Sequence, residues 1–210
     1  MPLTSGTALT YDPGVFVYRK GIFCLESEWF GLMSPMSVRY ALDFLKSSDY
    51  RIPVIHRDVA TAAEIAHYMR KWTMQSHEGY SILWIAIHTR RGLLLPGDVR
   101  RASERMDLDA LETCLAGKCA GRLIHFGGCR TIALPPRRIR QFLRVTRAVA
   151  VSGFHEEVEW TESTLFEMSY FVALQHHPLT PLGIRKVAAH MRRHHKQGIE
   201  EFGFSIVTAR

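Results

Sequence analysis

The stretch Ser81–His88, which reads SILWIAIH, decides the fold expected for this chain. Residues 82–87 are all apolar and lack the alternation of a strand that turns one face to water. A short, continuous apolar run of this kind is typical of a strand covered on both faces, as in a parallel sheet. The stretch therefore predicts a central strand with helices packed on both sides of it.

Further strands are expected before and after this one. Pro53 indicates that one of them lies at an edge of the sheet, because proline cannot donate a hydrogen bond to a strand ladder. The last segment, near the end of the chain, is expected to close the sheet. The segments interpreted as strands are 21–25, 52–56, 81–88, 122–126, 148–152 and 204–207.

Helical patterns separate these strands. The clearest begins at Thr61, which forms a capping box with Glu64. The segments interpreted as helices are 36–46, 61–73, 107–116, 138–146, 162–175 and 182–195. Alternation of strands and helices predicts right-handed βαβ units, and hence an α/β three-layer sandwich with a mostly parallel sheet of about six strands.

The composition fits a single domain over residues 1–210, in which 47% of the residues are hydrophobic. We expect residues 1–20 to be an N-terminal extension and the polar, arginine-rich segment 89–106 to be a mobile loop. The four cysteines show no disulfide framework, the N-terminus does not resemble a signal peptide, and no apolar run is long enough to cross a membrane. A cytoplasmic protein without a membrane partner is therefore expected.

The chain is basic, with a formal charge of +7. No interleaving of aromatic and basic residues accompanies this charge, so neither DNA nor RNA is expected as a partner. Arg137, Arg140, Arg144 and Arg147 recur at helical spacing and could form one basic stripe. Such a stripe could bind an anionic ligand or partner, or it could be a solvated helix face.

Two expected strands end in reactive side chains, the one with His88 and the one followed by Cys129. Active residues of open parallel sheets lie at the carboxyl ends of the strands, so an imidazole and a thiol would face each other if these strands are neighbours. Gly127 and Gly128 would allow a tight turn that projects the thiol. The alternative is a small buried cysteine and a hydrogen-bonded core histidine.

Three segments resemble motifs of the caspases, in the same order along the chain. LAGKCAGRLIHFGGCRT (115–131) is similar to the caspase segment that leads to the nucleophile motif Q-A-C-R-G. IHTRRGLLL (87–95) is similar to the histidine loop, and residues 151–160 resemble the strand and loop that pair with substrate. Together these motifs resemble the prokaryotic caspase-like cysteine peptidases of the caspase, metacaspase and CHAT-type group, and they imply a caspase-like sandwich.

The resemblance implies a mechanism and partners. Cys129 would attack a peptide carbonyl, His88 would protonate the leaving amine, and the N–H groups of Thr89 and Cys129 would hold the oxyanion. Thr89 stands where the family usually has glycine. No cofactor and no metal are implied. By analogy the enzyme would cleave a protein or peptide substrate, and an anionic or nucleotide signalling ligand could activate it in bacterial anti-phage defence. The alternative is a catalytically inactive caspase-like module that binds a ligand or protein partner.

The residues with which caspases grip aspartate are missing. Gly127 stands where the family has glutamine, and acidic residues cluster around the expected site instead. Carboxylates select a basic side chain by charge pairing, so cleavage after arginine or lysine is expected, with Arg100-Arg101 and Arg137-Arg138 as self-cleavage points. The alternative is that the glutamates form a solvated surface. The expected substrate-binding residues are Glu26, Glu28, Gly127, Glu157, Glu159, Trp160 and Glu162.

Overall fold

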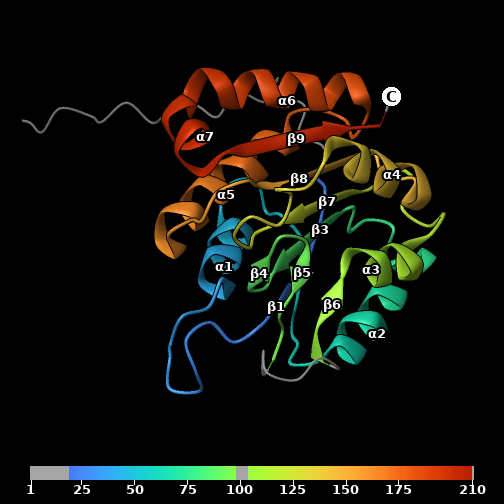
Figure 1. Cartoon of the computed structure of the whole chain (residues 1–210). Coiled ribbons are helices and arrows are strands. Elements are labelled where there is room, and N and C mark those ends of the chain that lie inside the picture. The colour runs from blue at the N-terminus through green and yellow to red at the C-terminus, as the bar shows by residue number, and fades with distance from the viewer. Residues whose placement is uncertain (1–18, 98–103, 210) are drawn as a thin grey trace, which may run out of the picture.

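The computed structural model describes residues 19–97 and 104–209 (Figure 1). Most of the expected N-terminal extension 1–20, the Arg100-Arg101 pair and the middle of the expected loop 89–106 lie outside the described residues.

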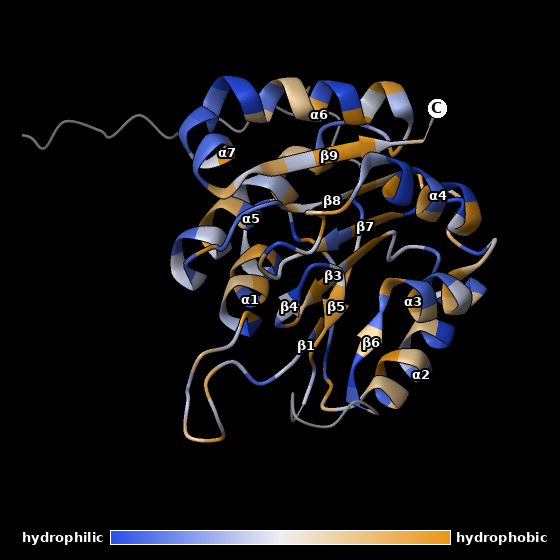
Figure 2. Cartoon of the chain, in the orientation of Figure 1, coloured by the Kyte–Doolittle hydropathy of each residue, from blue (hydrophilic) through white to orange (hydrophobic). Residues whose placement is uncertain are grey.

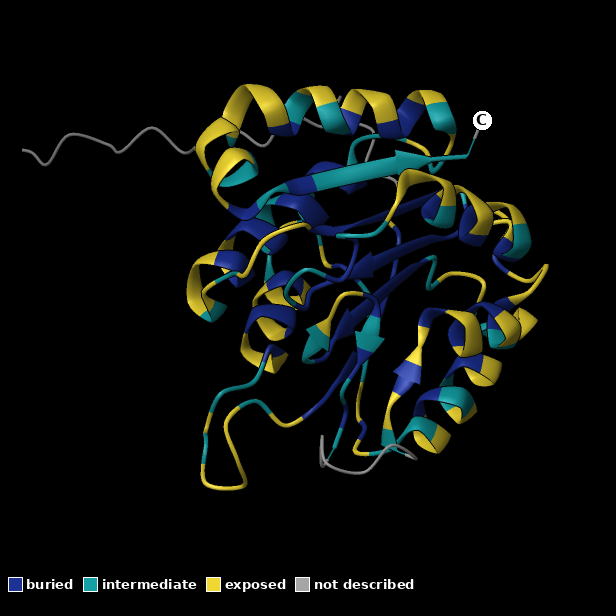
Figure 3. Ribbon diagram, viewed as in Figure 1, coloured by how far each residue is buried: buried dark blue, intermediate teal, exposed yellow. Residues whose placement is uncertain are grey.

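A six-stranded sheet forms the centre of the molecule, with the order β2-β1-β3-β7-β8-β9 (Figure 1). The first five strands are parallel, and β9 pairs antiparallel with β8. Every residue of β1, β3, β7 and β8 is buried, as Figure 3 shows in dark blue. The predicted mostly parallel sheet and the edge position of β2 are confirmed. The strands are β1 Ile22–Glu26, β2 Val54–Asp58, β3 Ile82–Ala86, β7 Leu123–Phe126, β8 Ala150–Phe154 and β9 Phe204–Thr208.

Helices cover both faces of this sheet. One apolar core lies beneath α2, α3 and α4, and a second lies beneath α1, α5, α6 and α7. Neighbouring residues of a strand point into different cores, and Figure 2 shows the apolar residues concentrated on the central strands. The helices are α1 Arg39–Ser47, α2 Ala62–Trp72, α3 Leu108–Leu115, α4 Pro136–Thr146, α5 Trp160–Gln175, α6 Pro181–His194 and α7 Lys196–Phe202. Among the described residues, no helix combines the length and the apolar character needed to cross a membrane.

The described parts of the segment 89–106 are ordered into strands rather than one irregular loop. Strands β4 (Thr89–Arg90) and β5 (Leu93–Leu94) form a hairpin, and β5 also pairs with β6 (Met106–Asp107). Arg91 and Gly92 have φ angles of 47° and 79°, as a two-residue hairpin turn requires. The apolar residues after Gly92 therefore fold back on the histidine loop, and the described residues 89–97 and 104–106 include three short strands.

Helix α7 was not anticipated from the sequence. Its seven residues have little apolar periodicity, and it is separated from α6 only by a bend at His195, where φ is −133°. Phe202 anchors it in the core, and Gly203 ends it in the left-handed conformation with φ 57°.

The capping box that opens α2 is formed as the sequence predicts. The Thr61 hydroxyl accepts from the Glu64 N–H, and the Glu64 carboxylate accepts from the Thr61 N–H. We expect Thr61→Ala to lower the free energy of unfolding by about 1 kcal/mol, measured by urea denaturation. Thr113→Ala is the matched control, because Thr113 is exposed in the interior of α3, and it should cause no comparable loss. Equal losses in both variants would contradict the assignment of the cap.

Candidate functional site

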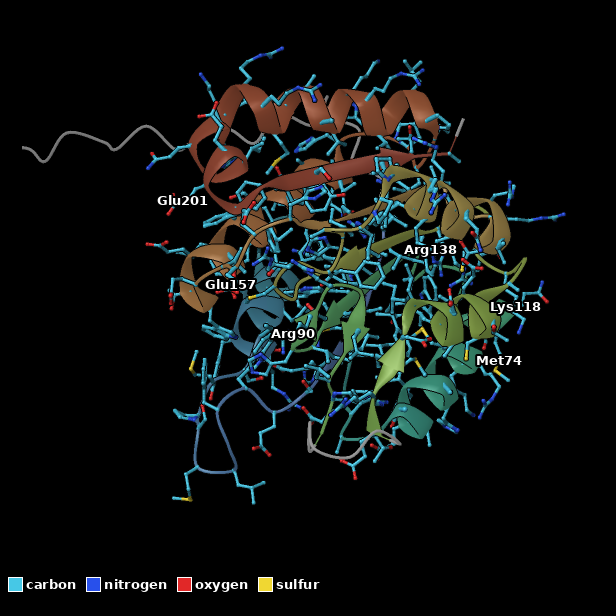
Figure 4. The ribbon with its side chains drawn as sticks, in the orientation of Figure 1. Met74, Arg90, Lys118, Arg138, Glu157 and Glu201 are labelled. Atoms are coloured by element: carbon cyan, nitrogen blue, oxygen red, sulfur yellow. The ribbon has the colours of Figure 1, made fainter. Side chains whose placement is uncertain are left out.

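A cavity of about 1250 Å³ opens at the carboxyl edge of the sheet. Its walls come from the segments that follow β1, β2, β3, β7 and β8, with further residues from β3 and α5. His88 and Cys129 both line it, because β3 and β7 are neighbours in the sheet. Arg90 and Glu157, labelled in Figure 4, are among the lining residues.

His88 is held in one orientation by the loop that follows β1. Its Nε2 lies 2.6 Å from the carbonyl oxygen of Trp29. A carbonyl oxygen only accepts, so Nε2 carries the proton and Nδ1 is the nitrogen available to take one. The Trp29 ring packs edge-on at 4.9 Å from the imidazole, and the Phe30 ring packs at 5.9 Å. The tautomer is thus set for a base that acts through Nδ1.

The loop is in turn fixed by the buried carboxylate of Glu26. Four donors bind this carboxylate: Trp29 Nε1 at 2.6 Å, and Ser37 Oγ, the Val38 N–H and His56 Nε2 at 2.7 Å each. Burial acts to raise the pKa of Glu26, but the four hydrogen bonds together hold that pKa below its usual value of 4.5. Glu26 was expected to bind substrate, yet it does not line the cavity and instead orders the loop that carries the His88 partner.

The Cys129 turn packs tightly against the histidine loop. A Cβ on Gly128 would lie 2.3 Å from the Ile87 carbonyl oxygen and 2.4 Å from Thr89 Oγ1, so no side chain fits there. The sequence suggested that Gly127 and Gly128 supply turn flexibility, but neither has a positive φ, and Arg130 is the left-handed residue of the turn with φ 52°. The glycines are required for close approach instead of for backbone conformation.

Thr89 joins the two loops by its side chain. Its Oγ1 donates to the carbonyl oxygen of Cys129 at 2.6 Å. In the hairpin, Arg90 is paired with Leu93, and the Leu95 N–H donates to the His88 carbonyl oxygen. Hydrogen-bonded and non-hydrogen-bonded pairs alternate along antiparallel strands, so the N–H of Thr89, which lies between them, points away from β5. In the described part of the chain, the Cys129 N–H makes no backbone hydrogen bond either. Within the described residues, neither of the two expected oxyanion donors is used in a backbone hydrogen bond.

The thiol of Cys129 is bound to the loop between β8 and α5. Its Sγ accepts from the Val158 N–H at 3.4 Å and donates to the Val158 carbonyl oxygen at 3.7 Å. The Arg130 N–H donates to the Glu156 carbonyl at 3.0 Å, and the Arg130 guanidinium lies 3.7 Å from the Glu157 carboxylate. Among the described residues, no hydrogen bond joins Cys129 to His88. The structure thus brings the two groups to one cavity with the thiol turned to Val158.

A buried polar network lies under the cavity, and sequence reasoning missed it. Glu167 on α5 accepts from His125 Nε2 at 2.7 Å and from Trp84 Nε1 at 3.2 Å. His125 Nδ1 lies 2.9 Å from Ser152 Oγ, which also accepts from the Tyr170 hydroxyl at 3.1 Å. Burial raises the pKa of Glu167 above its usual value of 4.5, although the contacts with His125 and Trp84 oppose this. The available signal was a histidine inside an apolar strand, since a buried polar group needs a partner.

The expected substrate-binding residues divide into two groups. Glu162 on the first turn of α5 and Glu26 do not line the cavity. The remaining five do: Glu28, Gly127, Glu157, Glu159 and Trp160.

In the described ranges, one group of side chains has the spacing for a metal ion: Glu26, His56 and Asp58, whose ligand atoms lie within 4.8 Å of one another. Both Glu26 oxygens are already occupied by hydrogen bonds, two on each oxygen. This arrangement fits a structural hydrogen-bond centre better than a metal site.

The predicted arginine stripe lies on α4. Arg137, Arg140 and Arg144 line a second cavity of about 960 Å³ beside the end of β9, whereas Arg147 is the left-handed residue after the helix. Arg138 pairs with Glu112 and Asp109 on α3. The Arg137-Arg138 pair, named above as a self-cleavage point, lies in the first turn of α4.

The fold and the cavity define the class of this protein. It is an α/β three-layer sandwich with a histidine and a cysteine at the carboxyl edge of its sheet. The sequence profile of the Family of unknown function (DUF6642) matches residues 19–207, and the chain belongs to that family. No curated protein matches the chain.

The hydrogen bonds of Glu26 make the stability depend on acid pH. Because the folded-state pKa of Glu26 lies below 4.5, its contribution is present above that pH and is lost as the pH falls through the folded-state value. We expect Glu26→Gln to flatten the decline in unfolding free energy below about pH 4.5, measured by urea denaturation at a series of pH values. Glu28→Gln is the control at an exposed carboxylate and should leave the decline unchanged. A steep decline that persists in Glu26→Gln would contradict this role.

The close approach at Gly128 predicts a strong effect of the smallest side chain. Gly128→Ala should destabilise the protein by about 1–3 kcal/mol, because the new methyl group meets backbone that cannot move aside. Thermal and urea unfolding measure this loss. Gly79→Ala is the matched control, because a Cβ at Gly79 meets nothing within 4 Å. Unchanged stability of Gly128→Ala would show that the two loops are not packed as described.

Proposed function

We propose that the protein is a caspase-like cysteine endopeptidase in which Cys129 is the nucleophile and His88 the general base and acid. The observation that carries this proposal is the shared cavity: His88 and Cys129 both line it, and the hydrogen bond of His88 Nε2 to the Trp29 carbonyl leaves Nδ1 as the nitrogen that can take a proton. A thiol needs such a base to react at neutral pH.

The available N–H groups of Thr89 and Cys129 support acyl transfer. They belong to the two loops that carry the base and the nucleophile, and these loops are joined by the hydrogen bond from Thr89 Oγ1 to the Cys129 carbonyl oxygen. Thr89 takes the place of the usual glycine and keeps a backbone N–H, and its side chain binds the Cys129 carbonyl oxygen.

The contacts of the thiol indicate a resting state. Val158 occupies both hydrogen-bonding directions of Sγ, so the loop that carries it has to shift before Cys129 reaches a substrate carbonyl. The same contacts favour the second candidate, a catalytically inactive module that uses the cavity to bind a ligand or partner. Reactivity of the thiol separates the two.

Covalent labelling tests the peptidase. We expect a peptidyl acyloxymethyl ketone ending in arginine to form one adduct, located on Cys129 by peptide mass spectrometry. His88→Ala should slow labelling by about 10²–10⁴-fold, because the base is lost. Cys114→Ala is the matched control and should label as the unchanged protein does.

Persistent labelling of Cys129→Ala at the same rate would refute the proposed nucleophile. Labelling of Cys129 at a rate that does not depend on His88 would refute the proposed base and favour the binding module. Cleavage of an internally quenched peptide by the unmodified protein, and not by Cys129→Ala, would distinguish an endopeptidase from a protein that is only alkylated.

A further inference from the structure

The cavity of about 960 Å³ beside α4 is an arginine groove, lined by Arg137, Arg138, Arg140 and Arg144. Among the described residues that line it, none is acidic. Arg138 is already paired with carboxylates on α3. In the described part of the chain, Arg137, Arg140 and Arg144 form no ion pair, and all three are exposed. The groove therefore presents three unpaired guanidinium groups, which favour an acidic ligand.

The three unpaired arginines follow one face of α4, because they are three, four and seven residues apart. From Arg137 to Arg144 the row extends about 10 Å along the helix axis. Thr208 and Ala209, at the end of β9, also line the groove. A row of charges of this length fits a run of several anionic groups and not one small anion.

The segment 156–162, which reads EEVEWTE, is an acidic segment of matching length. Its four glutamates are all exposed. Glu157 lies next to Arg130, whereas Glu156, Glu159 and Glu162 form no ion pair within the described residues. A short extended stretch and the first turn of α5 separate Glu156 from Glu162 by at most about 15 Å. Three unpaired carboxylates thus face solvent over a distance similar to that of the arginine row.

The arginine groove and the acidic segment lie apart in one molecule. Because β9 is antiparallel to β8, Thr208 pairs with Ala150 at the start of β8, whereas the acidic segment follows Phe154 at its end. Arg138 and Glu157, both labelled in Figure 4, lie on different sides of the molecule. The two sets of unpaired charges are therefore available to a second copy of the chain.

We propose that the arginine groove of one copy binds the acidic segment of a second copy. The contact is heterologous, so a dimer retains one open groove and one open acidic segment and grows into open chains or closed rings. The formal charge of +7 opposes association. This repulsion is largely screened beyond about 10 Å at 0.1 M salt, whereas opposite charges in contact still attract. The inference does not depend on the reactivity of Cys129.

The salt dependence of the molecular mass is the first test. Analytical ultracentrifugation of the unmodified protein at about 50 mM salt should show a mass that rises with protein concentration. At about 500 mM salt the mass should fall to that of the monomer, because the charge pairs are screened. A protein that stays monomeric at about 0.5 mM in low salt, or one whose association does not depend on salt, would overturn the inference.

Neutralised variants test which surfaces meet. Arg140→Gln with Arg144→Gln removes charge from the groove, and Glu156→Gln with Glu162→Gln removes it from the acidic segment. Neither glutamate lines the cavity that holds the histidine and the cysteine. Each double variant should associate at least about tenfold more weakly than the unmodified protein. An equal mixture of the two should form a 1:1 complex that grows no further, because one variant retains the acidic segment and the other retains the groove.

Arg192→Gln with Arg193→Gln is the matched control. Both residues are exposed on α6 and do not line the groove, and the pair changes the net charge as much as the groove variant does. This control should associate as the unmodified protein does. An equal loss in the control, or a mixture of the two neutralised variants that stays monomeric, would overturn the inference. Undiminished association of either neutralised variant alone would also overturn it.

Discussion

The contact between Gly128 and the histidine loop is the constraint on which the rest of the site depends. The Gly128 Cα packs on the Ile87 carbonyl and the Thr89 side chain without room for a methyl group, so the ends of β3 and β7 are held together. Thr89 then binds the Cys129 carbonyl, which fixes the position of the thiol relative to the imidazole. The separation of the two reactive groups is therefore set by backbone packing and not by a bond between them.

Two buried carboxylates serve this site in opposite ways. Glu26 is surrounded by four donors, and its pKa is lowered because they outweigh the cost of burial. Glu167 has donors on one oxygen only, and its pKa is raised because burial dominates. The same residue type thus has its pKa shifted in opposite directions, depending on how many donors surround it.

The sequence predicted the fold well because the fold depends on local patterns. The apolar run 82–87, the capping box at Thr61 and the hairpin turn at Gly92 each specify their own element. It also placed His88 and Cys129 at or just after strand ends, and the pairing of β3 with β7 in the structure brings them to one cavity. The sequence could not show that Glu26 is buried and Glu28 exposed. The groups that bind Glu26 belong to Ser37, Val38 and His56, which are distant in sequence. Glu167 was missed because its partners, Trp84 on β3 and His125 on β7, are distant in sequence and meet it only when α5 packs on the sheet.

Assembly of the cavity from five strand ends has a consequence for the order of folding. The walls include residues near 28, 60, 88, 128 and 158, and parallel strands meet only after the helices between them have packed. Contacts of such long sequence separation form late, because the entropy of closing each loop must first be overcome. A nascent chain that already contains both His88 and Cys129 still lacks the segment around Val158. The cavity is therefore completed only when β8 and the segment after it have been synthesised and docked.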